Sequence, residues 1–209
     1  VQEHFKKNVG NHFVKNFPEY YSYITPAVRD QEQDLGRPKG GLAQLHNASI
    51  DMKTERVKTK SYRLQAQILH FTNVKLLWIN SYFPTDPQTQ NFHDDDLTEV
   101  LREAEDILDA EEFDHVLWSG DLNWDPRRNS GFSLTVEAFM RRVGLHSAWE
   151  KYPVTHTHVH TDMVGTSTLD HFMVDVELLE VVRDAGALNN LGDNLSRHSP
   201  IMIKLELGN

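Results

Sequence analysis

The sequence predicts a single α/β domain, built as a sandwich of two packed β-sheets with helices on the outside. Many short strand-like runs alternate with only a few helical stretches along the chain. No internal repeat, low-complexity tract or linker divides residues 1–209. A chain of 24.1 kDa with 39% hydrophobic residues is also long enough to bury a full core.

Strand-like runs dominate the first half of the chain, after a helical stretch expected at residues 5–16. They are rich in β-branched and aromatic residues, which favours strands. Pro26 ends the first run, and Gly40-Gly41 predicts a tight turn or a close approach of the backbone. The expected strands are residues 20–25, 42–46, 53–58, 61–71 and 74–82, the middle ones paired as hairpins.

Two helices are expected in the second half. Apolar residues recur at helical spacing over residues 97–108, and Asp94, Asp95 and Asp96 precede them, where acidic groups suit the helix dipole. Residues 134–143 form the second expected helix. The remaining expected strands are residues 115–119, 154–160, 167–174 and 200–207.

The formal charge of −10 at first argues against a nucleic-acid partner, because phosphate attraction needs Lys and Arg. Its distribution changes that conclusion. Residues 94–114 hold eleven acidic residues and one basic residue, Arg102, while the rest of the chain has equal numbers of both. One solvated helix therefore carries the whole excess, and a DNA substrate remains compatible with the composition.

The composition argues against cysteine-based sites and against a membrane span. The chain has no cysteine, which rules out disulfides and thiolate metal sites. No apolar run approaches the roughly 18 residues needed to cross a bilayer, so no membrane partner is expected.

A strand-like run ending in Gly120 is followed by Asp121 and, two residues later, by Asn123. On an extended backbone these two side chains point to the same side. A carboxylate and an amide in this arrangement can share a water or a phosphate oxygen, the carboxylate as base or indirect metal partner and the amide as orienting donor. An Asx-turn that ends the strand accounts for the same residues equally well.

Asp170 follows Leu169 and precedes an apolar run, which places it at or just inside the start of a strand. A carboxylate there is poorly solvated unless it is paired, and His198 is the natural partner. An Asp–His pair fixes the imidazole ring and keeps a proton available for a phosphate oxygen. A purely structural hydrogen bond is the alternative.

Other residues become functional candidates only when they are considered together with the residues of these two pairs. Glu3 alone would be a frayed terminal charge, but with the set it becomes a candidate ligand for a hard cation such as Mg²⁺. Tyr82 closes an apolar strand and either donates its hydroxyl to a phosphate oxygen or caps the core. His156, His158 and His160 alternate, so a metal clip and an ordinary exposed strand face are both compatible with them.

Six motifs occur in a fixed order along essentially the whole chain, and the ordered set is far more specific than any one motif. They are Gln2-Glu3, Gly40-Gly41-Leu42, Asn80-Ser81-Tyr82-Phe83-Pro84, Gly120-Asp121-Leu122-Asn123, Leu169-Asp170-His171-Phe172 and Ser196-Arg197-His198-Ser199-Pro200. The set resembles the endonuclease/exonuclease/phosphatase superfamily, which implies the DNase I-like fold, a four-layered α/β sandwich of two packed mixed sheets flanked by helices. Residues 37–42 most resemble the endonuclease domains of non-LTR retrotransposons.

The resemblance implies a metal-dependent hydrolase that cleaves phosphodiester bonds of DNA, an endonuclease. The implied cofactor is Mg²⁺, for which Mn²⁺ can substitute, and it would act as a Lewis acid on the phosphoryl oxygens and the leaving group. Glu3 would match the metal-binding residue, and Tyr82 the residue that contacts the scissile phosphate. An intracellular location that includes the nucleus, and a monomeric isolated domain, are the corresponding expectations.

The resemblance also assigns two catalytic pairs. Asp121 and Asn123 would match the pair that activates and orients the attacking water. Asp170 and His198 would match the Asp–His pair that stabilises the pentavalent phosphate.

The chain departs from the family in three places. Arg197 stands where the family has Asp immediately before the final His, which changes the charge beside the metal. The sequence opens after the point where the family's first strand, with its Asn, would end, so the domain is expected to lack that strand. Residues 166–168 are Thr-Ser-Thr where abasic-site endonucleases carry an aromatic wedge, so abasic-site specificity is not supported.

Two alternatives remain open at this point. A phosphatase or phosphodiesterase acting on a small or lipid phosphoester would use the same core, although the Trp-Cys-Asp-Arg segment of the inositol-phosphate members is absent from this cysteine-free chain. A catalytically degenerate binding module of the same fold is the other alternative, and Arg197 with the missing strand supports it.

Overall fold

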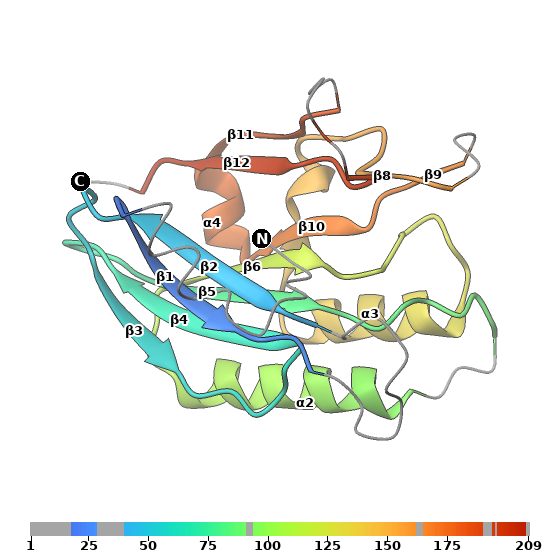
Figure 1. Cartoon of the computed structure of the whole chain (residues 1–209), viewed down its shortest axis with the longest axis horizontal. Helices are drawn as coiled ribbons and strands as arrows, with labels where there is room; N and C mark the ends of the chain where they lie inside the picture. Colours follow the sequence, from blue (N-terminus) through green and yellow to red (C-terminus); the bar gives the residue numbers. More distant parts are fainter. Residues whose placement is uncertain are drawn as a thin grey trace.

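The computed structural model describes residues 18–28, 40–90, 94–161, 165–189, 194 and 196–207. At its centre is a six-stranded mixed sheet, with two long helices on one face and further strands on the other (Figure 1). In sheet order the strands are β3 (Lys53–Val57), β4 (Leu64–His70), β5 (Lys75–Tyr82), β6 (His115–Asp121), β10 (Asp170–Val174) and β7 (His146–Ser147). The α/β sandwich predicted from the sequence is confirmed.

Strand directions bring particular strand ends together. β3, β4 and β5 form an antiparallel meander, so the expected hairpin pairing is confirmed. β5 and β6 are parallel, which requires a crossover connection between them. β6 and β10 are antiparallel. The ends of β5 and β6 and the start of β10 therefore meet at one edge of the sheet.

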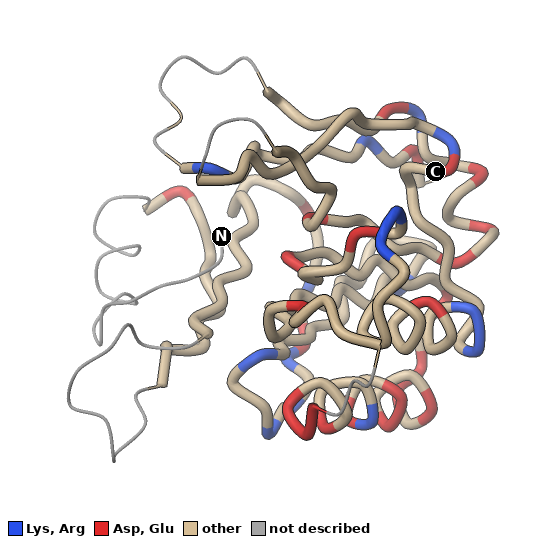
Figure 2. The backbone as a smooth tube through the Cα atoms, turned by 90° about the vertical axis from the view of Figure 1, so that its right-hand side faces the viewer, with Lys and Arg blue, Asp and Glu red and all other residues tan. Residues whose placement is uncertain are grey.

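The crossover helix α2 (Asp95–Ala110) lies where the helical spacing predicted it. The carboxylate of Asp94 caps it by accepting a 2.9 Å hydrogen bond from the backbone N–H of Leu97. Its buried residues are Leu97, Val100, Leu101, Ala104 and Ile107. Acidic residues line its other side (Figure 2), so the expected solvated acidic surface is confirmed.

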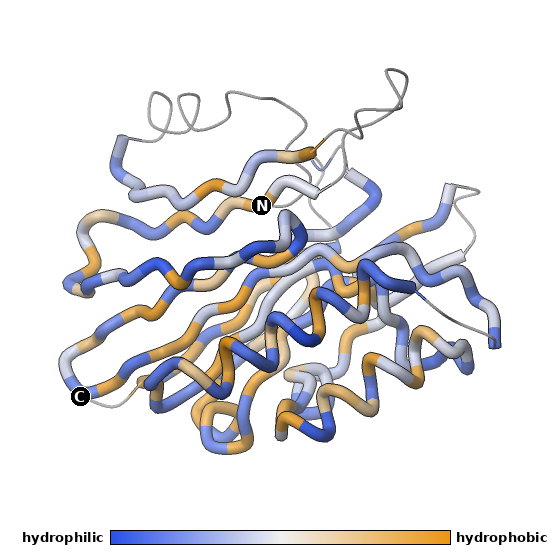
Figure 3. The backbone as a smooth tube through the Cα atoms, turned by 90° about the horizontal axis from the view of Figure 1, so that it is seen from below, coloured by the Kyte–Doolittle hydropathy of each residue, from blue (hydrophilic) through white to orange (hydrophobic). Residues whose placement is uncertain are grey.

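Helix α3 (Gly131–Arg142) begins earlier than the predicted residue 134. Ser130 explains the difference, because its hydroxyl accepts a 3.0 Å hydrogen bond from the backbone N–H of Ser133 and so caps the helix. α3 runs beside α2 (Figure 3), and Arg142 forms a 3.1 Å ion pair with Glu105 across the two helices. None of the helices described is long and apolar enough to cross a bilayer.

Strands on the other face form two separate antiparallel pairs among the residues described. β1 (Tyr20–Thr25) pairs with β2 (Leu42–Asn47), and β11 (Val182–Ala187) pairs with β12 (Ile201–Leu205). Gln44 and Gln65 tie the first pair to the central sheet by donating to the carbonyls of Trp78 and Tyr23.

The second pair packs through an apolar cluster that includes Leu117, Phe172 and Val182. Helix α4 (Val176–Val181), which the sequence analysis did not predict, leads from β10 into β11. A cavity of about 690 Å³ lies beside this cluster, and Trp78, Phe172 and Ile201 line it, together with Asp121, Asp170 and His198.

The strands expected at residues 154–160 and 167–174 are shorter than predicted. β10 (Asp170–Val174) forms most of the second, while β8 (His158–Val159) and β9 (Thr166–Ser167) pair in a short ladder. Between β9 and β10, the backbone N–H groups of Thr168 and Leu169 donate to the side chains of Asp125 and Thr157. Because side chains take these hydrogen bonds, the ladder is interrupted just before Asp170.

Candidate active site

Three predicted site residues form a row across neighbouring strands. Tyr82, the last residue of β5, is the register partner of Asp121 at the end of β6. Asp121 is in turn the register partner of Asp170, the first residue of β10. Side chains of register partners share a face of the sheet. The sheet therefore gathers a phenol and two carboxylates at one edge, and the expected placement of Tyr82 and Asp170 at strand ends is confirmed.

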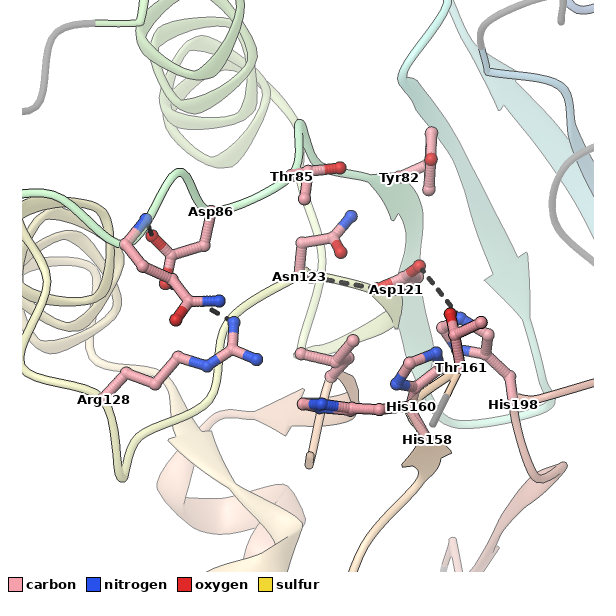
Figure 4. Close-up of a pocket in the computed structure, with 12 residues that line it drawn as sticks. Tyr82, Thr85, Asp86, Asp121, Asn123, Arg128, His158, His160, Thr161 and His198 are labelled. Atoms are coloured by element: carbon pink, nitrogen blue, oxygen red, sulfur yellow. Dashed lines mark hydrogen bonds and ion pairs between the residues drawn. The ribbon is translucent and has the colours of Figure 1, made fainter. Parts of the chain in front are cut away.

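His198 lies between the two carboxylates. Its Nδ1 is 2.9 Å from Asp170 Oδ2, so the two residues are the partners that the sequence predicted. Its Nε2 is 3.9 Å from Asp121 Oδ2, an ion-pair distance that is too long for a hydrogen bond (Figure 4). Both carboxylates are buried and the imidazole is about one-third exposed. The ring can therefore move a proton between Asp170 and the cavity.

Asp170 is held in place by a residue that the sequence analysis passed over. The hydroxyl oxygen of Thr157, which is fully buried, accepts hydrogen bonds from the backbone N–H groups of Leu169 and Asp170 at 2.9 and 3.0 Å. The Trp149 indole also donates to the Asp170 carbonyl at 3.1 Å. Thr157 lies between two of the alternating histidines, and its partners are 12 and 13 residues away, so no local pattern indicates its role.

Asn123 takes part in the Asx-turn that the sequence allowed, and its side chain is fixed beside Asp121. Its backbone N–H donates to Asp121 Oδ1 at 3.0 Å, which is the Asx-turn that ends the strand. Its side-chain amide donates to the Phe83 carbonyl at 2.9 Å, which fixes the amide beside the carboxylate. Asn123 also has a φ of 47°, and Gln88 is the other non-glycine residue described with a positive φ. Both line the same cavity, where such backbone strain is characteristic of functional sites.

A buried histidine connects the two motifs. The Nε2–H of His171 lies within hydrogen-bonding distance of the carbonyls of Trp124 and Thr168, at 2.8 and 3.1 Å. Its ring stacks on Trp124 with 4.9 Å between centroids. Burial lowers the pKa of His171, so the ring is neutral and acts as a fixed donor. The segment after Asn123 is thereby tied to the segment before Asp170.

A second structural link reinforces this connection. Burial alone would raise the pKa of Asp125, but hydrogen bonds from Arg127 and from the backbone of Thr168 outweigh it, and the pKa lies below its usual value. The ionised carboxylate accepts from the Thr168 N–H at 3.1 Å.

The candidate site opens onto a cavity of about 530 Å³, which we call the main cavity. Its lining includes Tyr82, Asp121, Asn123, Arg128, His158, His160 and His198 (Figure 4).

The alternating histidines pack at one end of the main cavity. The His158 ring lies 4.6 Å from that of His198 and 5.5 Å from that of His160. Burial, followed by the charges of His198 and His160, lowers the pKa of His158 to about 4. His160 Nε2 contacts Ser167 Oγ at 2.5 Å. The second interpretation of the histidines, a strand face beside the site, therefore fits the structure better than a metal clip.

One group of three side chains in the described ranges brings its possible ligand atoms within 4.8 Å of one another, and it consists of Asp121, Asp170 and His198. Its two carboxylates supply the oxygen ligands that hard divalent cations prefer. The donor set at this edge thus fits a cation such as Mg²⁺. The predicted metal ligand Glu3 lies outside the described residues.

No protein-family model and no curated protein matches the sequence. Solved structures do match the fold. The AP endonuclease LMAP from Leishmania major superposes with a TM-score of 0.70 at 16% identity, over 99% of this chain and 77% of its own. The endonuclease domain of TRAS1, a telomere-specific non-LTR retrotransposon, gives 0.67 at 13% identity, over 92% and 83%. The 3′ phosphatase NExo from Neisseria, bound to product DNA hairpin, gives 0.60 at 13% identity, over 95% and 93%.

The chain has the DNase I-like fold. The likeness covers nearly the whole chain, so the fold implied by the ordered motifs is confirmed. In this DNase I-like domain, Tyr82, Asp121, Asn123 and His198 come from motifs up to 116 residues apart and line the main cavity. Asp170 lines the second cavity, which shares Asp121 and His198 with the first.

Arg197, which precedes His198 in this DNase I-like domain, lies at the rim of the main cavity. Its side chain is exposed and donates a hydrogen bond to the hydroxyl of Thr161. Its backbone carbonyl accepts from the N–H of Val159 at 3.0 Å, which attaches the final loop to β8. Arg197 therefore contributes a positive charge at the rim, close enough to His158 to help lower its pKa.

Proposed function

We propose that this chain is a Mg²⁺-dependent phosphodiesterase that cleaves DNA as an endonuclease. The observation that carries the proposal is the row of Tyr82, Asp121 and Asp170, with His198 bridging towards both carboxylates at the floor of an open cavity. The structural neighbours, which are endonucleases and a 3′ phosphatase bound to product DNA, support the same class of reaction.

Asp121 and Asn123 act on the attacking water. The Asp121 carboxylate is held by the backbone N–H of Asn123 and remains part of the cavity lining, so it can accept a proton from a water placed above it. The Asn123 amide, anchored on the Phe83 carbonyl, orients that water towards phosphorus.

Asp170 and His198 act on the phosphoryl oxygens. Asp170 accepts from Nδ1–H and thereby sets the tautomer, so that Nε2 is directed at the main cavity. As an imidazolium, with Nε2 protonated as well, the ring donates from there to the phosphate oxygens and stabilises the negative charge that develops on them. The Tyr82 hydroxyl, which comes from the neighbouring strand, supplies a further donor.

A Mg²⁺ or Mn²⁺ ion, with Glu3 among its ligands, would supply Lewis-acid stabilisation of the same oxygens and of the leaving group. The DNA substrate is also the basis for placing the protein inside the cell, the nucleus included. Descent from a mobile element is part of the proposal, because a retrotransposon endonuclease domain is among the structural neighbours.

Nicking of supercoiled plasmid tests this function. The full chain should convert supercoiled DNA to open circles with Mg²⁺ or Mn²⁺, and EDTA should stop the reaction. Asp121→Ala and His198→Ala should each lower the rate at least ~10²-fold, the scale of losing one acid/base or electrostatic group. Asp109→Ala, on the exposed side of α2, is the matched control and should nick at the wild-type rate.

Three outcomes contradict the proposal. Wild-type rates in both site variants would reject the assigned roles. Hydrolysis of a small phosphate ester without plasmid nicking would indicate a phosphatase instead. DNA binding with no hydrolysis of either substrate would indicate a catalytically degenerate binding module.

A further inference from the structure

Arg128 is the only Lys or Arg among the described residues that line the main cavity. It follows Asn123 in the loop that leads to α3, and 22% of its side chain is exposed. Figure 4 shows it at the end of the cavity opposite His198, with Asn123 and Asp121 between them. The rest of the lining includes the carboxylates of Asp86 and Asp121, which repel an anion.

A buried carboxylate holds Arg128 from one side. Arg128 NH1 is 3.6 Å from Asp86 Oδ2, and the Asp86 side chain has no exposed surface. Asp86 does not depend on Arg128 for its hydrogen bonds, because the Ser130 hydroxyl donates to it at 3.0 Å and the Gln88 N–H at 2.7 Å. The ion pair with Asp86 is therefore not the only role that the guanidinium can have.

A hydroxyl holds Arg128 from the other side. Arg128 NH2 donates to Ser167 Oγ at 3.0 Å, and the same oxygen contacts His160 Nε2 at 2.5 Å. The backbone N–H of Arg128 also donates to the Asp125 carbonyl at 2.9 Å. Contacts on both sides fix the guanidinium before any ligand arrives, which reduces the entropy lost on binding.

The guanidinium keeps donor capacity for a ligand. It carries five N–H donors on three nitrogens. Its two side-chain contacts engage NH1 through the ion pair with Asp86 and NH2 through the bond to Ser167, while the group still lines the main cavity. A planar, fixed guanidinium at a polar cavity wall is well suited to a phosphate group.

We propose that Arg128 binds the phosphate adjacent to the scissile one, so that the substrate is a polynucleotide strand running along the main cavity from His198 past Asp121 to Arg128. This rests on the proposed function and specifies its substrate class. A small monoester has no second phosphate and leaves Arg128 unused. A strand of DNA necessarily brings a neighbouring phosphate with it, and contacts to such phosphates set the register of a substrate.

Arg128→Ala tests the assignment in two ways. Affinity for a labelled duplex oligonucleotide in EDTA should fall about 10-fold, and the slope of log K against log [salt] should lose about one unit. In nicking assays KM should rise while kcat stays within about twofold, because the neighbouring phosphate is held equally in the ground and transition states. Arg141→Ala is the matched control, since Arg141 is exposed on α3 and pairs only with Glu137 among its described contacts.

A substrate change tests the same contact from the other side. Replacing one of the two phosphates that flank the cleavage site with a neutral methylphosphonate should raise the wild-type KM about as much as Arg128→Ala does. In the Arg128→Ala protein, the same replacement should have little further effect. Arg128→Lys keeps a charge near Asp86 and should give an intermediate KM, which separates loss of the phosphate contact from loss of folding.

Equal KM and equal salt slope in wild-type and Arg128→Ala proteins would overturn this assignment while leaving the proposed function intact. The assignment would also fail if each methylphosphonate raised the KM of Arg128→Ala as much as it raises the KM of the wild type. If the wild-type protein neither binds nor nicks DNA, the proposed function fails and the Arg128 assignment fails with it.

Discussion

Asp121 and Asp170 stand directly opposite each other on the antiparallel strands β6 and β10. One hydrogen-bond ladder therefore positions both carboxylates. The loop before β12 places His198 beside them. A slip of one residue in this register would turn one of the acids to the opposite face of the sheet. Contacts that anchor the first residue of β10 consequently control the geometry of the whole site.

Thr157→Val should damage both stability and activity. The substitution keeps the shape of the side chain but leaves the buried N–H groups of Leu169 and Asp170 without their acceptor. We expect the free energy of unfolding to fall by about 1–3 kcal/mol. Because Asp170 also shifts, plasmid nicking should fall ~10-fold or more in the folded fraction. Urea denaturation and nicking rates, measured on the same preparation, check both effects.

Thr155→Val is the matched control for this prediction. Thr155 is exposed, and its hydroxyl contacts only the side chains of His156 and Asn189 among the residues described. Its unfolding free energy should change by less than about 0.5 kcal/mol. Equal losses in the two variants would show that Thr157 does not anchor β10.

Local patterns account for what the sequence predicted well. The buried residues of α2 were predictable because helical spacing and the Asp94 cap are both encoded within a few residues. Tyr82 and Asp170 were placed at strand ends because apolar runs stop or start beside them. By contrast, α4 has only six residues and passes directly into β11, so neither element had room for a readable period.

Tertiary contacts account for the parts of the site that the sequence did not reveal. Thr157 acts on Asp170 across 13 residues, and His171 on Trp124 across 47. Arg128 acquires its setting from Asp86 and Ser167, on two other segments of the chain. No spacing rule connects these partners, because the β6–β10 register that brings them together is a property of the folded sheet.

Gly40→Ala should destabilise the fold more than an ordinary strand glycine would. Gly40 has a φ of +73°, and a Cβ there would lie 2.6 Å from Tyr62 Cδ2 and 3.1 Å from the Tyr62 carbonyl oxygen. The close approach predicted for Gly40-Gly41 is thus confirmed. We expect a loss of at least about 1 kcal/mol of unfolding free energy, from the left-handed backbone and the clash together.

Gly186→Ala provides the comparison for Gly40. Gly186 lies in β11, and a Cβ there would meet no atom within 4 Å. Its melting temperature should stay near that of the wild type or rise slightly, because alanine reduces the entropy of the unfolded chain. If Gly40→Ala and Gly186→Ala have the same melting temperature, the contact between Gly40 and Tyr62 does not constrain the fold.

The neutral state of His158 should make the folded protein sensitive to acid. Burial and the neighbouring charges of His198, His160 and Arg197 favour the neutral ring, while Asp170 opposes them, and the resulting pKa is about 4. The unfolded chain protonates the same ring near its ordinary pKa of about 6.5. The unfolded state therefore binds more protons between these values, and stability falls as the pH is lowered from about 6.5 towards 4.

Replacing the ring removes this contribution. In His158→Gln, the free energy of unfolding should decline less steeply between pH 7 and pH 4.5 than it does in the wild type, because residue 158 no longer titrates. His146→Gln serves as the matched control, since 46% of the His146 side chain is exposed. Urea denaturation at several pH values measures the three slopes. Parallel curves for wild-type and His158→Gln proteins would show that the folded state does not hold this imidazole neutral.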